Sequence, residues 1–301
     1  MQLRSLHQGL YRLLLSTLLL LPIFAASLAQ ALQVPEEERL SYYAHLYEHL
    51  EQGASGALLR EALYQVLSSF HVPQKSAPDK LVSSCEPYRN KGCYGHRYFS
   101  YLKARRYLYG YLHLEEINGE YVIRCVYCER DYGPGDFPKN RQPGPGQIPG
   151  HLTINTEHTW PQSRFSDRYA KSLQKSDLHA IYPTTPSANT QRSNFEFAEV
   201  HTITHDTCEP SKKGQNRYGG SQTFYEPPDD HKGNVARALF YFAVRYQLPI
   251  SEVEEYYLRK WHWQDPVDEF EIWRHERIFE KQGVRNPFID HPELVDLIDN
   301  F

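Results

Sequence analysis

Hydrophobic positions follow the three- and four-residue spacing of amphipathic helices in the first and last thirds of the chain. Over residues 32–80 this spacing predicts two helices, closed by a proline-containing linker at 73–78. The same spacing predicts three further helices: over 98–112, over 234–246 and from Ser251 onward, where Glu254 stands in the capping-box position. The helix over 234–246 carries one broad apolar face, so we expect it to be buried.

Shorter apolar runs between these helices predict strands. A turn at Gly119 precedes a strand candidate at 121–127, and the segment 132–150, rich in proline and glycine, reads as a loop. Two more strands are expected over 152–157 and near 179–182. A short helix should begin after Pro186, with Ser187 as its cap. The pattern therefore predicts a mixed α and β domain.

Candidate chemistry is concentrated in two segments that follow the proline- and glycine-rich loop. Residues 155–163, N-T-E-H-T-W-P-Q-S, place Glu157 beside His158. Residues 176–194 then supply an acidic, amide and basic cluster: Asp177, His179, Asn189, Arg192 and Asn194. A hard cation takes carboxylate and amide oxygens as ligands, and a neutral imidazole accepts a proton from water. These residue types suit phosphodiester hydrolysis with one metal ion.

The two segments resemble the bacterial endonuclease I family of secreted and periplasmic nucleases, which use the ββα-metal (His-Me finger) site. The resemblance extends over about residues 85–298, including Y-F-S-Y-L-K-A-R-R-Y-L-Y-G at 98–110 and F-Y-E-P-P-D-D-H-K-G-N at 224–234. It implies an α+β nuclease domain in which strand, connection, strand and helix form the finger, with several helices around it.

The same resemblance implies a role for each motif residue. His158 would be the general base, and Glu157 and Asn189 would hold the metal ion, Mg²⁺ with Mn²⁺ or Ca²⁺ as substitutes. Arg168 is favoured over Arg164 as the arginine that holds the cleaved phosphate. Candidates for supporting residues around the site are Asp177, His179, Arg192, Asn194 and Glu226. Ala180 departs from the family pattern, in which an asparagine follows D-L-H, so the hydrogen bond of that amide is missing here.

Composition limits how nucleic acid would bind. The 301 residues are 40% hydrophobic with a net charge of −4, which becomes −6 without the first 31 residues, because these carry Arg4 and Arg12 but no acid. An acidic protein needs a local basic cleft to hold a polyanion. Basic residues that flank the motifs could supply that cleft: Arg97, Lys103, Arg105, Arg106, Arg164, Arg168, Lys171, Lys175 and Arg192.

The sequence of the amino terminus indicates an export signal. A charged start, an apolar run at 13–24 and the small-x-small site at 29–31 predict cleavage after Ala31 and a secreted or periplasmic protein. We therefore divide the chain into a signal peptide (1–31), an N-terminal helical segment (32–80) and a catalytic domain (81–301).

Five cysteines fit an oxidising compartment. Cys85 and Cys93 are the first choice for a disulfide, and Cys208 would pair with either Cys125 or Cys128, which leaves one thiol. The C-x-x-C pair could instead form half of a zinc site with His151, His158 or His179.

The sequence thus predicts a monomeric, metal-dependent, sequence-nonspecific endonuclease that acts on DNA, with RNA left open as a substrate, and that has no membrane contact once mature. Its products would carry 5′-phosphate and 3′-hydroxyl ends. Two alternatives stay open: a noncatalytic nucleic-acid-binding module of the same fold, and a zinc-stabilised hydrolase with another substrate.

Overall fold

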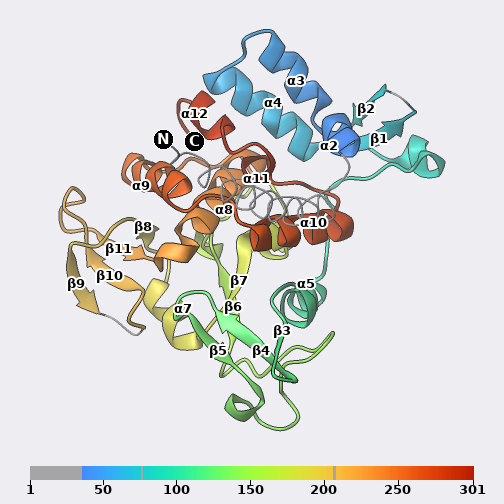
Figure 1. Cartoon of the computed structure of the whole chain (residues 1–301). Coiled ribbons are helices and arrows are strands. Elements are labelled where there is room, and N and C mark those ends of the chain that lie inside the picture. Colours follow the sequence, from blue (N-terminus) through green and yellow to red (C-terminus); the bar gives the residue numbers. More distant parts are fainter. Residues whose placement is uncertain (1–35, 76, 206–207) are drawn as a thin grey trace, which may run out of the picture.

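The computed structural model describes residues 36–75, 77–205 and 208–301 and combines helices with short strands (Figure 1). This confirms the α+β class. The predicted signal peptide, 1–31, lies outside the described residues. Within the described part, no helix has both the length and the apolar character needed to cross a bilayer.

The N-terminal segment consists of three helices and a hairpin: α2 (Glu36–Tyr42), α3 (Ala44–Glu51), α4 (Gly56–Ser68), β1 (Phe70–Gln74) and β2 (Ala77–Val82). The first predicted helix is broken at Tyr43, between α2 and α3. The predicted linker at 73–78 was wrong, because β1 and β2 pair antiparallel there. Pro73 falls where the register shifts between Val72 and Gln74, and proline is tolerated in a strand at such an irregularity. Strand β2 also runs across the predicted boundary at 80/81.

The next part of the chain leads towards the site. A 3₁₀ turn, η1 (Glu86–Lys91), precedes α5 (Tyr101–Tyr107), which continues into the π-helical turn η2 (Leu108–Leu112) and so confirms the helix predicted over 98–112. A three-stranded sheet follows: β3 (Glu115–Ile117), β4 (Glu120–Cys125) and β5 (Arg130–Tyr132). Asn118 and Gly119 both have positive φ, as the tight turn between β3 and β4 requires.

The proline- and glycine-rich segment after β5 contains one short turn, η3 (Pro134–Asp136), and is otherwise irregular, as predicted. It packs closely on η2: the backbone N–H of Gly146 donates to the carbonyl of Gly110 at 3.1 Å. A Cβ on Gly110 would lie 2.6 Å from the Gly146 nitrogen, so this contact requires glycine.

The centre of the molecule is an antiparallel strand pair followed by a helix: β6 (Asn155–His158), β7 (Ile181–Thr184) and α7 (Pro186–Arg192). Both strands begin two or three residues later than predicted, since η5 (Leu178–Ala180) takes the start of the second. The connection holds η4 (Gln162–Arg164) and α6 (Lys171–Lys175). The predicted cap Ser187 was wrong: Pro186 is the first helical residue, and the Thr185 side chain caps α7 by accepting from the Ala188 N–H at 3.2 Å.

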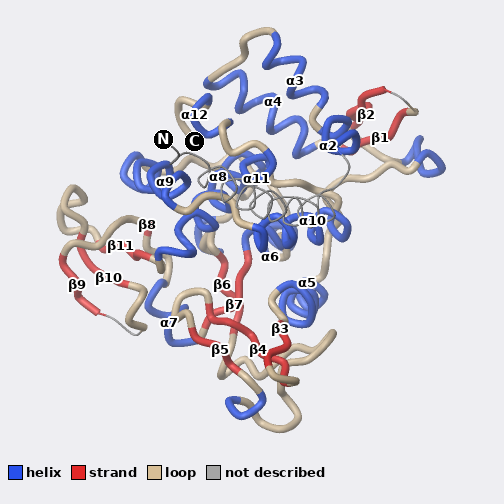
Figure 2. Tube along the Cα trace, in the orientation of Figure 1, coloured by secondary structure: helices blue, strands red, loops and turns tan. Residues whose placement is uncertain are grey.

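A four-stranded sheet in the order β8-β11-β10-β9 lies beside this centre and was not predicted. Its strands are β8 (Glu196–Phe197), β9 (Thr202–His205), β10 (Lys212–Gln215) and β11 (Thr223–Glu226), followed by the turn η6 (Asp229–His231). Figure 2 shows this sheet at one side of the molecule and the β3–β5 sheet below the central pair, while most helices gather above.

The C-terminal third is helical: α8 (Lys232–Arg245), α9 (Glu252–Gln264), α10 (Glu269–Gln282), α11 (Pro287–Asp290) and α12 (Leu294–Leu297). Helix α8 is buried on almost every side and contacts α4, α9 and α11, which confirms the predicted buried helix. Ser251 caps α9 by accepting from the Glu254 N–H at 3.3 Å. The Glu254 carboxylate turns away from the expected capping box and accepts from the Phe197 N–H and Arg164.

Two disulfides link described residues. Cys85–Cys93 confirms the first choice, and Cys128–Cys208 is one of the two alternatives left open, with Cys125 as a buried thiol. The predicted zinc alternative loses its C-x-x-C pair, because the Cys128 sulfur is in a disulfide and is not a free thiolate.

Candidate active site

The three principal candidates share one pocket. Glu157 and His158 end β6, and Asn189 lies on α7 beside it. The pocket has a volume of about 380 Å³ and is lined by Thr156, Glu157, His158, Pro161, Gln162, Ser163, Asn189, Ser193 and Asn194. Asn194, predicted as a supporting residue, is exposed at its rim. The structure therefore brings together residues from both motif segments.

The hydrogen bonds of His158 fix its tautomer. Its Nε2 lies 3.0 Å from the backbone carbonyl of Lys175, and a carbonyl can only accept, so Nε2 carries the proton. The Nδ1 atom therefore keeps its lone pair, and the Gln162 amide nitrogen lies 3.3 Å from it. Burial lowers the pKa of His158 to about 4, so the ring is neutral at physiological pH.

Glu157 is almost completely buried and is held from one side. Tyr127 donates a hydrogen bond to Oε1 at 3.0 Å, and the Arg192 Nε lies 3.1 Å from the same oxygen. Burial raises the pKa of Glu157 to about 7, against the opposing effects of Arg192 and Tyr127. Both contacts fall on Oε1, and the residue lines the pocket. A bound cation would stabilise the charged carboxylate that burial disfavours.

Asn189 presents its amide in a defined orientation. Its Nδ2 donates to the Asn155 Oδ1 at 2.9 Å and to the Thr156 carbonyl at 3.1 Å. Both amide protons are thus used on the β6 side, and the Oδ1 atom is the one left for a ligand. An amide oxygen and a carboxylate on the same pocket wall form a donor set that fits a hard divalent cation such as Mg²⁺.

Arg192 lies behind the pocket and is fully buried. Besides its contact with Glu157, its guanidinium donates to the carbonyls of Thr159 and Ser193, at 2.5 and 2.9 Å, and covers the Phe197 ring. It therefore ties α7 to the end of β6 and lies against the Glu157 carboxylate.

Four other candidates lie outside the pocket lining. Asp177 accepts from the hydroxyls of Tyr241 and Tyr246 on α8, and the His179 Nε2 lies 3.1 Å from the Val284 carbonyl. Glu226 pairs with Lys232 and Lys212, and the exposed Arg168 donates to Gln247 at 3.3 Å. The other arginine considered for the phosphate, Arg164, pairs with Glu254 at 3.1 Å.

Three residues shape the site in roles that the sequence analysis did not assign to them: Tyr127, Gln162 and Lys175. Tyr127 follows β4, and the neighbouring Val126 N–H donates to the Pro183 carbonyl of β7 at 3.0 Å, which places this tyrosine behind Glu157. Lys175 acts through its backbone carbonyl, which no side-chain motif can reveal. Gln162 lies in the motif segment 155–163, and this location is the one sequence signal that could have marked it as a site residue.

A second group of possible metal ligands is already neutralised by the protein. Among the described residues, His275, Glu276 and Asp290 form the one such cluster of His, Cys, Asp or Glu. Arg285 lies within it, 2.7 Å from Asp290 and 2.5 Å from Glu276. The guanidinium supplies the positive charge there, so this cluster is an ion-pair network.

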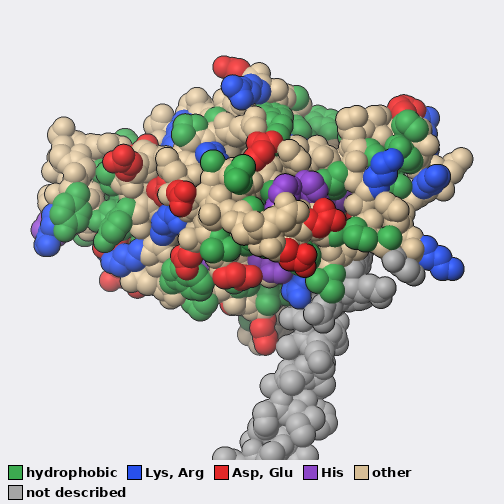
Figure 3. All heavy atoms as spheres, turned by 90° about the horizontal axis from the view of Figure 1, so that it is seen from above, with side chains coloured by type: hydrophobic (Ala, Val, Ile, Leu, Met, Phe, Trp, Pro, Cys, Tyr) green, Lys and Arg blue, Asp and Glu red, His purple; other side chains and the backbone are tan. Residues whose placement is uncertain are grey.

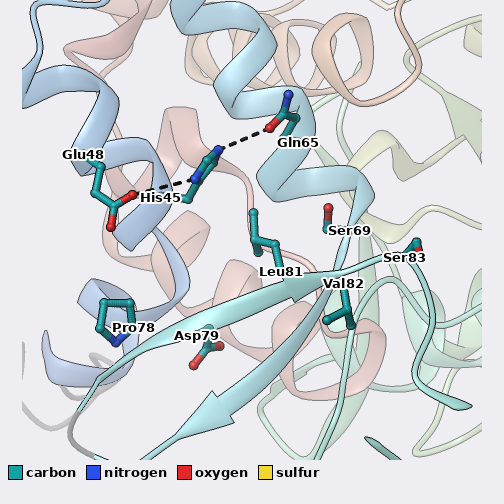
Figure 4. A pocket seen from close by; sticks show the side chains of 9 residues that line it. All are labelled: His45, Glu48, Gln65, Ser69, Pro78, Asp79, Leu81, Val82 and Ser83. Carbon is teal, nitrogen blue, oxygen red and sulfur yellow. Dashed lines mark hydrogen bonds and ion pairs between the residues drawn. The ribbon is translucent and has the colours of Figure 1, made fainter. Parts of the chain in front are cut away.

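Another pocket lies between α3, α4 and β2 (Figure 4), and its volume is about 480 Å³. His45 lies there between Glu48 and Gln65, at 3.9 and 3.2 Å. None of the predicted site residues lines it.

A strand with Glu157 and His158, an antiparallel partner strand and a helix with Asn189 define the ββα-metal, or His-Me finger, class of site. Residues 97–293 match the family model described as Endonuclease I. The chain belongs to the Endonuclease I family, which confirms the resemblance seen in its motifs.

Individual relatives carry both ribonuclease and deoxyribonuclease names. The extracellular ribonuclease of Bacillus subtilis (strain 168) is 39% identical over 162 residues, which are 48% of this chain and 53% of that protein. The extracellular deoxyribonuclease of Aeromonas hydrophila is 28% identical over 122 residues, 38% of this chain and 48% of the relative. Endonuclease-1 of Buchnera aphidicola subsp. Acyrthosiphon pisum (strain APS) is 28% identical over 123 residues, 41% and 47% of the two chains. The chain spans about half the length of the relatives it matches.

Proposed function

We propose that this protein is a metal-dependent, sequence-nonspecific endonuclease that hydrolyses phosphodiester bonds of DNA, with RNA as a second candidate substrate. The observation that carries the proposal is the pocket at the end of β6. There the lone pair of the His158 Nδ1 accompanies two hard oxygen donors, on Glu157 and Asn189. Membership of the Endonuclease I family and the names of the relatives support the same activity.

In this proposal His158 is the general base. Its Nδ1 accepts a proton from the attacking water, and the Nε2–H, held by the Lys175 carbonyl, keeps the ring in position and stabilises the imidazolium that forms. The exposed Gln162 amide now donates towards Nδ1, and a water molecule that displaces it would have the same hydrogen-bonding geometry.

Glu157 and Asn189 would hold the divalent ion, which when bound neutralises charge on the scissile phosphate and stabilises the leaving oxygen. Tyr127 and Arg192 keep the Glu157 carboxylate in place. Mg²⁺ is the ion we propose, because one carboxylate and one amide leave most of its coordination to water and phosphate oxygens. Mn²⁺ and Ca²⁺ are the substitutes to test. Products would carry 5′-phosphate and 3′-hydroxyl ends.

The proposal also covers the cellular location, the oligomeric state and the residues that contact phosphate. The disulfides Cys85–Cys93 and Cys128–Cys208 fit an oxidising, secreted or periplasmic location, which agrees with the extracellular and periplasmic names of relatives. We propose a monomer that reads phosphates and not bases, since phosphate contacts carry no sequence information. Arg168 stays a candidate for the arginine that holds the cleaved phosphate, although Gln247 now holds its side chain.

The test is cleavage of supercoiled plasmid by purified, oxidised protein with Mg²⁺ and with EDTA. His158→Ala should lose about 10²–10⁴-fold in rate, the usual contribution of a general base. His151→Ala is the matched control, because His151 is an exposed histidine outside the pocket lining. Cleavage that survives His158→Ala would contradict the base assignment. Binding of plasmid without cleavage under any divalent ion would favour the noncatalytic module.

A further inference from the structure

A large groove lies between α5, with the segment before it, and α10. Its volume is about 1040 Å³, and its walls come from residues between Arg97 and Leu112 and between Trp273 and Lys281. None of the motif residues Glu157, His158 or Asn189 lines it. The groove is therefore separate from the candidate catalytic pocket.

The lining of this groove is strongly basic. Arg97, Lys103, Arg106 and Lys281 are exposed, and no ion pair joins any of them to a carboxylate of the described residues. The fifth cation, Arg277, is paired with Glu280 at 2.8 Å. The lining thus carries four unneutralised positive charges, on a chain whose net charge is −4.

One face of the molecule shows a different distribution of charge. On the face seen from above in Figure 3, acidic and basic side chains are interspersed. Four like charges in one concavity raise the local concentration of an anionic ligand, which interspersed charges do not. The groove therefore favours a polyanion.

Exposed aromatic rings stand beside these charges. Tyr98 is 58% exposed and Tyr111 is 53% exposed, and both line the groove. The Tyr111 ring lies 5.5 Å from the ring of Tyr107, which also lines the groove. Exposed aromatic faces that alternate with cations are the arrangement on which unpaired nucleic-acid bases stack while their phosphates are neutralised.

Helix α5 connects this groove to the catalytic pocket. Lys103 and Arg106 of α5 line the groove, while the ring of Tyr101, on the same helix, lies 5.7 Å from the His158 ring. The Lys175 ammonium covers the Tyr101 ring at 4.4 Å, which adds positive charge on the catalytic side. A chain that crosses α5 would therefore meet cations on both sides of the helix.

We propose that the groove binds a single-stranded stretch of the nucleic-acid substrate, with its phosphates on Arg97, Lys103, Arg106 and Lys281 and its bases on Tyr98 and Tyr111. The identity of the ligand rests on the proposed nuclease function. The inference goes beyond that function because it assigns a strand-binding site outside the catalytic pocket.

The experiment measures binding apart from cleavage. Fluorescence anisotropy of a labelled oligothymidylate of about 12 nucleotides is recorded in EDTA at several salt concentrations. The groove variant carries Arg97→Gln, Lys103→Gln, Arg106→Gln and Lys281→Gln. The control variant carries four substitutions of exposed cations outside the groove: Lys75→Gln, Lys91→Gln, Lys139→Gln and Arg217→Gln. Both variants keep the same net charge.

We expect the groove variant to bind at least about tenfold more weakly than the control variant, and the slope of log Kd against log salt to fall by about 3, since each lost phosphate contact on a single strand removes about 0.7. Tyr98→Leu with Tyr111→Leu should weaken binding further than Tyr218→Leu, a change at an exposed tyrosine outside the groove. Equal losses in the groove and control variants would overturn the proposal.

Two further measurements distinguish a strand-binding groove from a docking surface for acidic proteins and from a protein without nuclease activity. Polyglutamate that displaces the oligonucleotide as well as unlabelled oligothymidylate does would show a surface for acidic proteins and would also overturn the proposal. Plasmid cleavage by the wild-type protein with Mg²⁺ is measured in parallel. Absence of cleavage contradicts the proposed function, whereas cleavage together with unchanged oligonucleotide binding in the groove variant contradicts only this inference.

Discussion

Two buried carboxylates, Glu157 and Asp290, each lie beside an arginine but differ in their hydrogen-bond partners and in the direction of their pKa shifts. At the candidate active site, the Tyr127 and Arg192 contacts of Glu157 both fall on Oε1, and burial raises its pKa to about 7. In the network at α10 and α11, Arg285 contacts both oxygens of Asp290, at 2.7 and 2.8 Å. Tyr43 and His275 add further contacts there, at 2.7 and 3.1 Å.

The pKa of Asp290 is accordingly held well below its usual range: burial opposes the shift, and the neighbouring His275 and Arg285 charges overcome it. The difference separates a structural ion-pair network, in which protein donors use both carboxylate oxygens of Asp290, from the candidate metal site, where the donors Tyr127 and Arg192 both use Oε1 of Glu157. A closed network uses its oxygens internally, while an open site leaves oxygens on Glu157 and Asn189 and a nitrogen on His158 without a full set of protein partners.

The largest expected effect on stability tests this contrast. Asp290→Asn should lower the free energy of unfolding by about 3–5 kcal/mol, because it removes a buried charge and places an amide nitrogen against the donors Arg285, Tyr43 or His275. Glu276 stays beside Arg285 but cannot replace these contacts. Glu157→Gln should cost much less, because Arg192 keeps the carbonyls of Thr159 and Ser193 as acceptors. Urea unfolding at pH 7 measures both. Equal losses would mean that the active-site carboxylate is as much a structural ion as Asp290.

The same two variants should also differ in activity, with the larger loss in Glu157→Gln. Plasmid cleavage per folded molecule should be retained by Asp290→Asn and lost by Glu157→Gln. Loss of activity in both variants with intact folding would break the distinction between the closed and the open network.

The disulfides give the next contrast. Cys128–Cys208 joins residues 80 positions apart, and the Cys128 sulfur lies 3.6 Å from the hydroxyl of Thr185, the cap of α7. Replacing both cysteines by serine should lower stability by about 2–4 kcal/mol and reduce activity, because α7 carries Asn189. Cys85–Cys93 closes only 8 positions outside the pocket, so its double serine variant should lose less stability and keep its rate. Equal effects in thermal unfolding and cleavage would contradict this.

Metal binding should stabilise the open site alone. A cation at about a hundred times its Kd adds about 2.7 kcal/mol to the free energy of unfolding, so Mg²⁺ or Mn²⁺ should raise the Tm reversibly with EDTA. Asn189→Leu and Glu157→Gln should abolish the rise, and Asp290→Asn should keep it. A rise that persists in Asn189→Leu but disappears in Asp290→Asn would place the ion in the His275, Glu276 and Asp290 cluster.

The open site was easier to predict from the sequence than the closed network. Glu157, His158 and Asn189 lie in two short segments of recognisable residue types, and the strand pair and helix that carry them are local. Asp290, by contrast, meets Tyr43 from 247 positions away, which no spacing along the chain reveals. The β1–β2 hairpin was hidden by Pro73 and Pro78. Strand β10, K-K-G-Q, has no apolar alternation, because its pairing rests on backbone hydrogen bonds to β9 and β11.

The smallest expected effect is on the pH dependence of stability and concerns His113, a buried histidine whose Nε2 already has a protein partner. The Nε2 of His113 accepts from the Arg274 Nε at 3.1 Å, so it has no place for a second proton, and burial, with the Arg274 and His231 charges, holds its pKa well below the usual value. Below about pH 6.5 the unfolded chain therefore binds a proton that the folded chain does not, and stability falls as the pH is lowered.

For this one residue the fall approaches about 1.4 kcal/mol per pH unit. His113→Gln, whose side-chain oxygen can accept from Arg274, should flatten the stability curve by that amount between pH 6 and 5 relative to the wild type, as measured by urea unfolding. The exposed His151→Gln variant should run parallel to the wild type. A His113→Gln curve that is also parallel would mean that the proton enters the folded protein at this site. His113 would then differ from the buried groups of the Asp290 network, because its ring could take up a proton in the folded protein without loss of stability.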